Sequence, residues 1–542
     1  MRHDFASLSE LYNYSTKVYA SRPVAQFVDG SQKYTFAEFG DTCRNLSKRL
    51  QNFGINSNDK IAILSQNMPN WTVAFFAITA FGRIAVPILN EMTEPEITSI
   101  LLHSEAKAIF VSRKLFPRLS DKVLEQMSLV ICTDDLSIMK ANDEKFTCDG
   151  TISNPLSDDI AAIIYTSGTT GTAKGVMLSH RNLCANVLEA WHAQKVRRRD
   201  VFLSILPMAH TYEMSIAMLY PFSVGACVYY ITKAPTPSVL MDALKKVRPT
   251  CMLSVPLIIE KIYRSSIIPT IEKSRFLKAL NNFSPKILCL LVGIKLKKTF
   301  GGRIKFFGIG GAKLDPEVER FLHRARFPYA IGYGLTETAP LICNASPFKT
   351  CVGSTGIAAH GVQIRLENVD PVTGQGELVV KGDNVMRGYY KDYTRTESVL
   401  SADGWFHTGD IATKDKKNRY YIKGRLGSLI LGPSGENIYP EEIETVLNNF
   451  KDVNESLVIE RNGHLIALVQ FNDNVLDWNL EGQDKFVEML EDRKKAILDY
   501  VNKRVRKSSN IQSIEIQKEP FVKTATHKIK RFLYNGDRST NG

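Results

Sequence analysis

The sequence predicts a large N-terminal α/β domain of layered sheets and helices, followed by a small, mobile α+β domain at the C-terminus. The chain has 542 residues, a length that corresponds to roughly three domains or subdomains. Apolar segments typical of strands alternate with helical segments up to about residue 420, which indicates largely parallel sheets. Near residue 424 this alternation ends in a segment that is rich in glycine and carries two prolines.

This glycine-rich segment sets the expected domain boundary. Clusters of glycine and proline mark turns and linkers. We therefore predict an N-terminal domain over residues 1–424 and a C-terminal domain over residues 425–542.

Strand and helix patterns are clear at several places in the N-terminal domain. Ile61–Leu64 and Ile109–Val111 have the composition of short buried strands, and Trp71–Phe81 and Glu94–Leu102 have the spacing of helices. The longest uncharged apolar run, Ile216–Ile231, is interrupted by proline, serine and glycine and is shorter than the ~18 residues of a membrane span. We expect it to be buried core.

The C-terminal domain shows a mixture of helices and a hairpin. Pro440 is expected to open a helix, because a proline in the first turn removes an N–H that has no partner there. Leu457–Glu460 and Leu465–Phe471 read as strands on either side of the turn Asn462-Gly463. A charged helix is predicted over Asp484–Arg506.

Composition favours a cytoplasmic protein with an anionic partner. The N-terminus has early acidic residues and no apolar core, so it is not a secretory signal. Nine scattered cysteines without a C-x-x-C pair are typical of reduced thiols. The net charge is +13. Its basic clusters are either solvated surface or sites for nucleotides, coenzyme A or an acidic lipid surface, whereas no motif supports nucleic acid. These clusters are Lys195–Arg199, Lys295–Lys298, Lys503–Lys507 and Lys528–Arg531.

The loop Tyr165–Gly175, with the sequence YTSGTTGTAKG, is the strongest local signal. It follows the apolar run Ile160–Ile164, and the helix after it has Ser179 as its expected cap. Glycines let backbone N–H groups approach an anion, and the hydroxyls and Lys174 add donors and charge, which suits phosphate. The loop is not a Walker A motif, because alanine and glycine stand where that motif needs glycine and then serine or threonine.

This loop resembles the signature of the adenylate-forming (AMP-binding) superfamily. Within this superfamily, its segments are most similar to those of the long-chain fatty acyl-CoA synthetases. Five further segments resemble motifs of the family and follow in the same order. They are Gly308–Val318, Ile331–Thr338, Gly404–Asp410, Gly424–Ile430 and Thr524–Arg531.

The resemblance implies a ligase that uses ATP, Mg²⁺ and coenzyme A. A fatty acid, long-chain by this similarity, would attack the α-phosphorus of ATP to give acyl-AMP and pyrophosphate, and coenzyme A would then take the acyl group. The site must bring an anion up to a polyanion, so it must neutralise phosphate charge. The C-terminal domain would rotate between the two steps about a hinge at residues 425–428.

The resemblance also implies roles for individual residues. The phosphate loop would use Thr166, Ser167, Gly168, Thr169, Thr170, Gly171 and Lys174. Thr336 would bind the α-phosphate, Glu337 with Thr166 would hold Mg²⁺, and Gly311, Ala312, Tyr333 and Gly334 would surround the adenine. Asp410 and Arg425 would bind the ribose, Lys528 would bridge the α-phosphate and the carboxylate, and His210 would lie near the reacting carboxylate. Taken alone, Asp410 could cap a turn and His210 could be a core histidine, and a lysine in a basic run such as Lys528 is more often on the surface.

Two departures from the family motifs leave the second step open. His527 stands where the family has glycine before its lysine, and Ser428 stands where the hinge usually carries aspartate or lysine. An acyl-AMP ligase that serves a carrier protein and a non-catalytic lipid-binding protein therefore stay as alternatives. A P-loop kinase is a weaker one.

Residues 286–305 combine an apolar run with a basic segment, which bears on membrane contact. The basic segment Lys295–Lys305 follows the apolar run Lys286–Ile294. This pair of segments would contact the inner face of an anionic membrane, or it would be a core strand with a solvated flank. The sequence slightly favours the strand.

Overall fold

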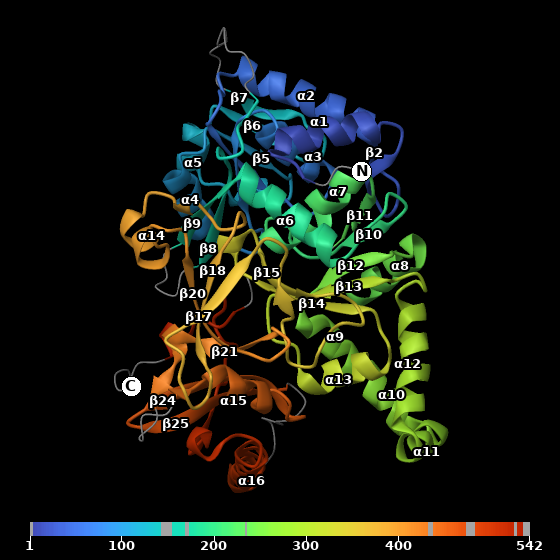
Figure 1. The fold of residues 1–542 in the computed structure, drawn as a ribbon, viewed down its shortest axis with the longest axis vertical. Helices are drawn as coiled ribbons and strands as arrows, with labels where there is room; N and C mark the ends of the chain where they lie inside the picture. The colour runs from blue at the N-terminus through green and yellow to red at the C-terminus, as the bar shows by residue number, and fades with distance from the viewer. Residues whose placement is uncertain are drawn as a thin grey trace.

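The structure, a computed structural model, describes residues 4–141, 154–167, 173–233, 236–431, 437–472, 483–524 and 528–534. In Figure 1 the C-terminal elements form a smaller part at the lower left, and the larger part, with the two wide sheets, occupies the top and the right-hand side. This arrangement confirms the predicted class, a large α/β domain with a small α+β domain. The exact boundary at residue 424 stays a prediction.

One wide sheet has nine strands and is mainly parallel. Its parallel neighbours β14, β13, β12, β10, β11 and β1 carry antiparallel strands at both edges. In sheet order the strands are β16 (Ile357–Ala358), β15 (Leu341–Ala345), β14 (Tyr329–Gly334), β13 (Phe306–Ile309), β12 (Cys251–Ser254), β10 (Val201–Ser204), β11 (Cys227–Tyr230), β1 (Pro23–Phe27) and β2 (Lys33–Thr35).

The second wide sheet has eight strands and carries the glycine-rich loop. The predicted strands Ile61–Leu64 and Ile109–Val111 are confirmed within β3 and β5. In sheet order the strands are β19 (Gly388–Tyr389), β9 (Ala173–Ser179), β8 (Ile160–Ser167), β4 (Ile84–Ile88), β3 (Lys60–Leu64), β5 (Ala108–Val111), β6 (Leu129–Cys132) and β7 (Ile138–Ala141).

Helices between the sheets form the main core. α3 (Pro69–Thr79) contacts strands of both sheets and is buried along its whole length, which explains why its sequence is apolar on all sides. It matches the helix predicted over Trp71–Phe81, and α4 (Glu94–Ser104) matches the second predicted helix. Ser179 caps α6 (His180–Ala193) as predicted, because its hydroxyl accepts the amide N–H of Asn182.

Several other elements complete the large part. The predicted core run Ile216–Ile231 is confirmed as buried from the π-helix Glu213–Leu219 through β11, with partly exposed sites only near its end. The remaining helices of this part are α1 (Leu8–Val18), α2 (Phe36–Asn52), α5 (Asp121–Gln126), α7 (Tyr220–Val224), α8 (Pro237–Val247), α9 (Pro256–Ile262), α10 (Ile268–Lys273), α11 (Arg275–Phe283), α12 (Pro285–Thr299), α13 (Pro316–Arg324) and α14 (Tyr393–Val399).

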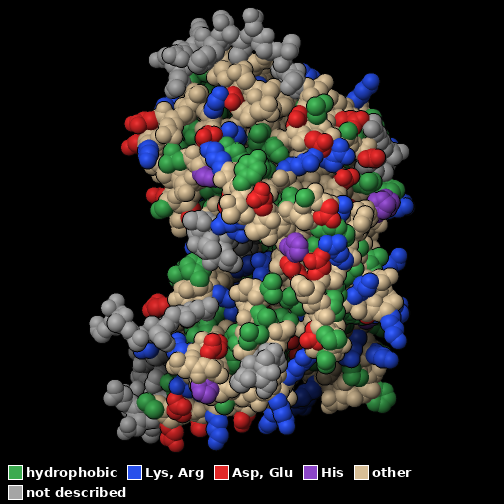
Figure 2. All heavy atoms as spheres, turned by 60° about the vertical axis from the view of Figure 1, so that its left-hand side comes forward, with side chains coloured by type: hydrophobic (Ala, Val, Ile, Leu, Met, Phe, Trp, Pro, Cys, Tyr) green, Lys and Arg blue, Asp and Glu red, His purple; other side chains and the backbone are tan. Residues whose placement is uncertain are grey.

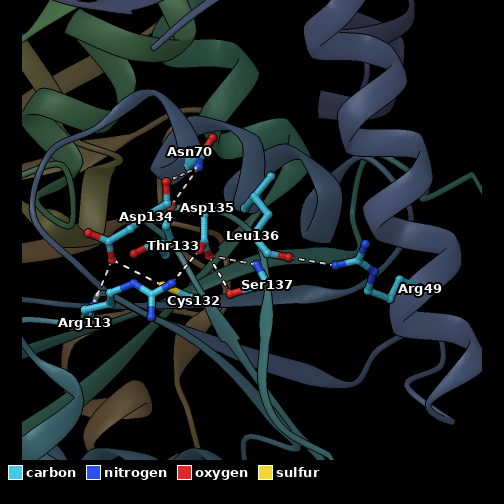
Figure 3. A network of polar contacts seen from close by, with 9 residues as sticks. All are labelled: Arg49, Asn70, Arg113, Cys132, Thr133, Asp134, Asp135, Leu136 and Ser137. Carbon is cyan, nitrogen blue, oxygen red and sulfur yellow. Dashed lines mark hydrogen bonds and ion pairs between the residues drawn. The ribbon is translucent and has the colours of Figure 1, made fainter. Parts of the chain in front are cut away.

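A polar network closes the turn between β6 and β7, residues 133–137 (Figure 3). The amide of Asn70, on α3, donates to the backbone oxygens of Thr133 and Asp134, at 2.7 and 3.2 Å. The carboxylate of Asp135 accepts the N–H and the hydroxyl of Ser137, at 3.0 and 2.6 Å. These bonds hold the turn in shape and fix it to α3, so the network serves the fold.

An antiparallel sheet of four strands leads to the C-terminal part. Its order is β17 (Gln363–Glu367), β18 (Gly376–Lys381), β20 (Phe406–Lys414) and β21 (Tyr420–Arg425). Beyond Arg425 the chain passes through a short 3₁₀ turn, Leu426–Ser428, and the two-residue strands β22 (Ile430–Leu431) and β23 (Asn437–Ile438).

The C-terminal part has its own three-stranded sheet and its own core. α15 (Pro440–Leu447) opens at Pro440, and β24 (Val453–Arg461) pairs with β25 (His464–Phe471), as predicted. Asn462 and Gly463 both have positive φ, 55° and 78°, as a tight hairpin turn requires. α16 (Gln483–Asn502) confirms the charged helix, and β26 (Ser513–Ile516) completes the sheet.

The run Lys286–Ile294 is the clearest error of the sequence interpretation. It forms most of α12 and is not a core strand. Leu288, Gly293 and Leu296 are buried, but Ile287 and Ile294 are exposed. A short apolar run does not distinguish a strand from a helix.

Candidate active site

The β8–β9 hairpin places the two ends of the glycine-rich loop. Thr166 and Lys174 lie opposite each other in its antiparallel ladder. A Cβ on Gly175 would lie 2.9 Å from the side chain of Ile163 and 3.1 Å from the ring of Tyr165, so this position needs glycine. Ser167 ends β8. The predicted loop residues Gly168, Thr169, Thr170 and Gly171 lie outside the described residues.

Lys174 lies near Glu337, and the side chain of Tyr389 contacts both residues. Its ammonium lies 5.2 Å from the ring centroid of Tyr389, and the Tyr389 hydroxyl donates to Glu337 Oε1 at 2.9 Å. Burial lowers the pKa of Lys174, and the nearby Glu337 carboxylate opposes this shift. The phosphate-loop lysine and the predicted Mg²⁺ ligand therefore share one small region.

The end of β14 and the 3₁₀ turn Thr336–Thr338 position Thr336 and Glu337. A Cβ on Gly334 would lie only 1.6 Å from the backbone oxygen of Pro340, so the chain can pass there only with glycine. The amide of Met386 donates to the backbone oxygen of Glu337 at 2.8 Å. Residues 331–337 are partly exposed, and a ligand can reach this edge of the sheet.

Asp410 is the buried centre of a partly exposed charged cluster. Its side chain is 5% exposed; it accepts the hydroxyl of Tyr333 at 2.6 Å and forms an ion pair with Arg425 at 2.9 Å. Asp410 and Arg425 face each other across β20 and β21. Gly311 and Ala312 lie on the exposed turn after β13, where Gly311 has a φ of +88°, a region that favours glycine.

Lys528 reaches this cluster from the C-terminal part. It is accessible to solvent, yet the protein packed around it lowers its pKa, and Arg425 lowers it further. Asp410 and Glu337 act in the opposite direction. His210 also lies within the influence of Lys528: burial, and then the charge of Lys528, lower the pKa of His210 to about 4. His210 is therefore neutral at physiological pH.

Contacts between distant segments hold the C-terminal part against the large part. The hydroxyl of Tyr439 donates to Gln375 Oε1 at 2.7 Å, and Lys530 lies 3.7 Å from Glu96. At the predicted hinge, the Ser428 hydroxyl donates to Glu441 Oε1 at 2.5 Å. Serine in place of a charged residue thus still links the turn to α15. Figure 2 shows the hollow between the two parts, with Lys and Arg side chains beside it.

An apolar cavity extends behind the cluster. It is narrow, with a volume of about 40 Å³. β14 joins it to the charged cluster, because Ile331 and Gly332 line the cavity and the next residue, Tyr333, bonds Asp410. The other lining residues are Ala190, Ala193, Gln194, Tyr212, Ile216, Tyr220, Phe306, Gly308, Ala330, Leu341, Asn344, Ala345 and Ser346.

The charges fit a polyphosphate. Three cations, Lys174, Arg425 and Lys528, come from three different segments and meet two carboxylates, Glu337 and Asp410. A partly buried surplus of positive charge is what an ATP site needs. Thr166 and Glu337 offer the oxygens that Mg²⁺ prefers, which suits a metal held chiefly by substrate phosphates.

The sequence did not reveal every member of this site. Tyr389 bridges Lys174 and Glu337, but it stands 52 residues after Glu337 in a segment without a chemical motif. The cavity residues were missed as well, since small and aromatic side chains occur in any core. Only the pairing of β19 with β9, which brings Tyr389 beside the loop, could have identified it.

Comparison with known proteins agrees with this geometry. A family model described as "AMP-binding enzyme" matches residues 14–390. Long chain acyl-CoA synthetase 6, peroxisomal, of Arabidopsis thaliana is 30% identical over 558 residues, covering 92% of this chain and 79% of that protein. 4-coumarate–CoA ligase 1 of Solanum tuberosum is 29% identical over 467 residues, covering 81% and 79%.

Solved structures share the fold. The o-succinylbenzoate CoA synthetase of Bacillus subtilis, in complex with its acyl-adenylate intermediate, superposes with a TM-score of 0.77 at 22% identity, over 97% of this chain and 98% of that one. The resemblance inferred from the motifs is therefore confirmed. The chain belongs to the AMP-binding enzyme family, and it is an adenylate-forming ligase.

Proposed function

We propose that this protein activates a long-chain fatty acid with ATP and then transfers the acyl group to coenzyme A. One observation supports this most directly: strand β14 joins an apolar cavity to a cluster of charged residues. Ile331 and Gly332 line the cavity, and Tyr333 bonds Asp410. An apolar chain in the cavity would leave its carboxylate near the phosphates of a nucleotide bound at the cluster.

In the first step, a carboxylate oxygen attacks the α-phosphorus and the bond to pyrophosphate breaks. Lys528 would hold both the carboxylate and the α-phosphate, since its charge falls between two anions that must approach each other. Lys174 would bind the outer phosphates, and Thr336 the α-phosphate. Asp410 would accept hydrogen bonds from the ribose hydroxyls. Mg²⁺, held by Glu337 and Thr166, would neutralise phosphate charge when bound.

In the second step, the sulfur of coenzyme A attacks the acyl carbonyl and AMP leaves. Lys528 no longer has a role there, so we propose that the C-terminal part rotates about residues 425–428. Gly427 has open space around it, and Ser428 is held by a hydrogen bond to Glu441. Rotation would break this bond together with the contacts of Tyr439 with Gln375 and of Lys530 with Glu96.

The lining of the cavity supports an apolar acid. Its walls are aliphatic, aromatic and glycine residues, with few polar groups. At about 40 Å³ the cavity is smaller than the about 300–1,000 Å³ that is usual for ligand pockets, so it would have to widen when an acyl chain enters. Such a cavity favours a hydrocarbon chain over an acid with several polar substituents.

Pyrophosphate exchange would test the proposal. The purified protein is given ATP, Mg²⁺ and fatty acids of increasing length, with 4-coumarate as the aromatic competitor. We expect carboxylate-dependent exchange that rises with chain length. Coenzyme A and an acyl carrier protein are then compared as acceptors. Higher exchange with 4-coumarate would contradict the fatty acid assignment, and transfer only to the carrier protein would contradict the acceptor.

A further inference from the structure

A helical hairpin far from the active-site cluster carries an unusual combination of charge and apolar exposure. It consists of α11 and α12, which pack against each other along the lower right edge of the molecule in Figure 1. Residues 273–303 contain eight basic residues and no acidic residue. All eight are exposed, and none forms an ion pair with another residue in the described part of the chain.

α12 has a buried apolar face and, in the described part of the chain, an exposed one. Leu288, Gly293 and Leu296 are buried. A Cβ on Gly293 would lie 2.2 Å from the backbone oxygen of Ala325, so this face of α12 packs very closely against the end of α13. The inner face therefore accounts for the stability of α12 and leaves the outer one to be explained.

The outer face is a continuous apolar stripe. Its members stand at i, i+3, i+4 and i+7, the spacing of one helix face. They are Ile287, Leu290, Leu291 and Ile294. The preceding helix adds Phe276, which is 70% exposed, and Phe283, which is 91% exposed. Single exposed apolar residues are common, but six of them on two consecutive helices indicate an interaction surface.

We propose that the α11–α12 hairpin docks on an anionic lipid bilayer surface, without crossing it. Basic side chains attract acidic headgroups while an apolar helix face enters the boundary of the acyl chains. The absence of any acidic side chain in residues 273–303 favours this occupant over a protein partner, whose surface would carry both signs of charge. None of the described helices combines the length and the hydropathy of a membrane span.

The inference does not depend on the identity of the acid. It rests on surface residues that lie outside the charged cluster, so it would hold if the substrate were aromatic. Conversely, the proposed fatty acid activity would hold if the hairpin were free in solution. The two proposals can therefore fail separately, and the assay below includes an activity control for that reason.

Vesicle flotation tests the proposal. The full chain is mixed with vesicles of phosphatidylcholine alone or of phosphatidylcholine with phosphatidylglycerol. We expect flotation with the anionic vesicles and a loss of flotation at high salt. The triple variant Lys295→Gln/Lys297→Gln/Lys298→Gln should bind roughly 100-fold more weakly, because each basic residue near an anionic surface strengthens binding about fivefold.

Matched controls separate the hairpin from net charge and from hydrophobicity. Lys414→Gln/Lys416→Gln/Lys417→Gln removes the same charge from exposed lysines elsewhere and should still float. Phe283→Ser should lower binding and Val372→Ser should not, although each of these side chains is 91% exposed. ATP–pyrophosphate exchange with a water-soluble acid should be equal in all variants, which shows that each variant is folded.

Three results would overturn the proposal. The first is the absence of flotation with anionic vesicles. The second is equal flotation of the two triple-lysine variants. The third is a concentration-dependent dimer, without vesicles, that Phe283→Ser dissociates, because the stripe would then serve a second copy of this chain.

Discussion

Two acidic residues of this protein, Asp135 and Asp410, have similar partners and different surroundings. Asp135 is 48% exposed and accepts from Ser137, two residues away, while Arg113 pairs with it from the neighbouring strand end. These contacts lower the pKa of Asp135, the Ser137 bonds most. Asp410 is 5% exposed, and its partners Tyr333 and Arg425 are supplied by other strands.

The two sites differ in the number of cations near the carboxylate and in how exposed they are. At the Asp135 turn, hydrogen bonds within the turn and one exposed ion pair satisfy the carboxylate (Figure 3). At Asp410, a second cation, Lys528, converges from the C-terminal part and has a lowered pKa. Gathering cations at a partly buried place costs free energy unless an anion binds. Surplus charge of this kind, rather than a carboxylate as such, indicates a ligand site.

The largest effect is expected from removing Lys528. Lys528→Ala should lower the adenylation rate about 10²–10³-fold, the usual cost of losing a group that stabilises transition-state charge. Thioester formation from supplied acyl-AMP should change far less. Arg113→Ala, which removes the cation of the Asp135 turn, should leave both rates unchanged. Equal loss of both half-reactions in Lys528→Ala would show that its role is not confined to the first.

Glu337 should show the next largest effect, on the metal dependence. Glu337→Ala is expected to raise the Mg²⁺ concentration needed for half-maximal exchange by about tenfold or more, because a charged ligand contributes roughly 1.5–3 kcal/mol. Tyr389→Phe keeps the carboxylate and removes only the 2.9 Å hydrogen bond to it, so its shift should be smaller. A titration of exchange rate against Mg²⁺ measures both. An unchanged Mg²⁺ requirement in Glu337→Ala would remove it as a ligand.

The Asp410 carboxylate should also control the pH dependence. Lys528 must be protonated to act, and the protein packed around it and Arg425 already lower its pKa below the ordinary 10.5. Asp410→Asn removes a charge that raises this pKa, so the alkaline limb of the adenylation profile should move to lower pH. Asp135→Asn should not move it. If the alkaline limb of the pH profile does not move in Asp410→Asn, a group other than Lys528 determines it.

The smallest effect is expected at the Asp135 turn itself. Asp135→Ala removes bonds from an exposed turn, where screening keeps each contribution small, so unfolding free energy should fall by about 1 kcal/mol or less. Pyrophosphate exchange should be unaffected. Urea unfolding with a matched activity assay measures both. A loss of activity without a loss of stability would contradict the structural role assigned to this turn.

Short-range patterns made much of the fold predictable from the sequence. Ser179 before α6, Pro440 at the start of α15 and Asn462-Gly463 in the hairpin act through their own neighbours, and the structure confirms each. The run Lys286–Ile294 failed because its conformation depends on what packs against it. Ala325 is distant in sequence, and its close approach to Gly293 is a tertiary contact that the run itself does not encode.

The site was predictable only where motifs marked it. Tyr333, Asp410 and Arg425 stand in recognisable segments, and the structure brings them within hydrogen-bonding distance. Tyr389 and the cavity lining depend on strand pairing and on side-chain volume, neither of which leaves a local signal.

The most direct test of the central claim is mass spectrometry of a single-turnover mixture of protein, ATP, Mg²⁺ and a long-chain fatty acid, without coenzyme A. We predict acyl-AMP and pyrophosphate in equal amounts, and their conversion to acyl-CoA and AMP once coenzyme A is added. ADP and inorganic phosphate in place of acyl-AMP would contradict the account.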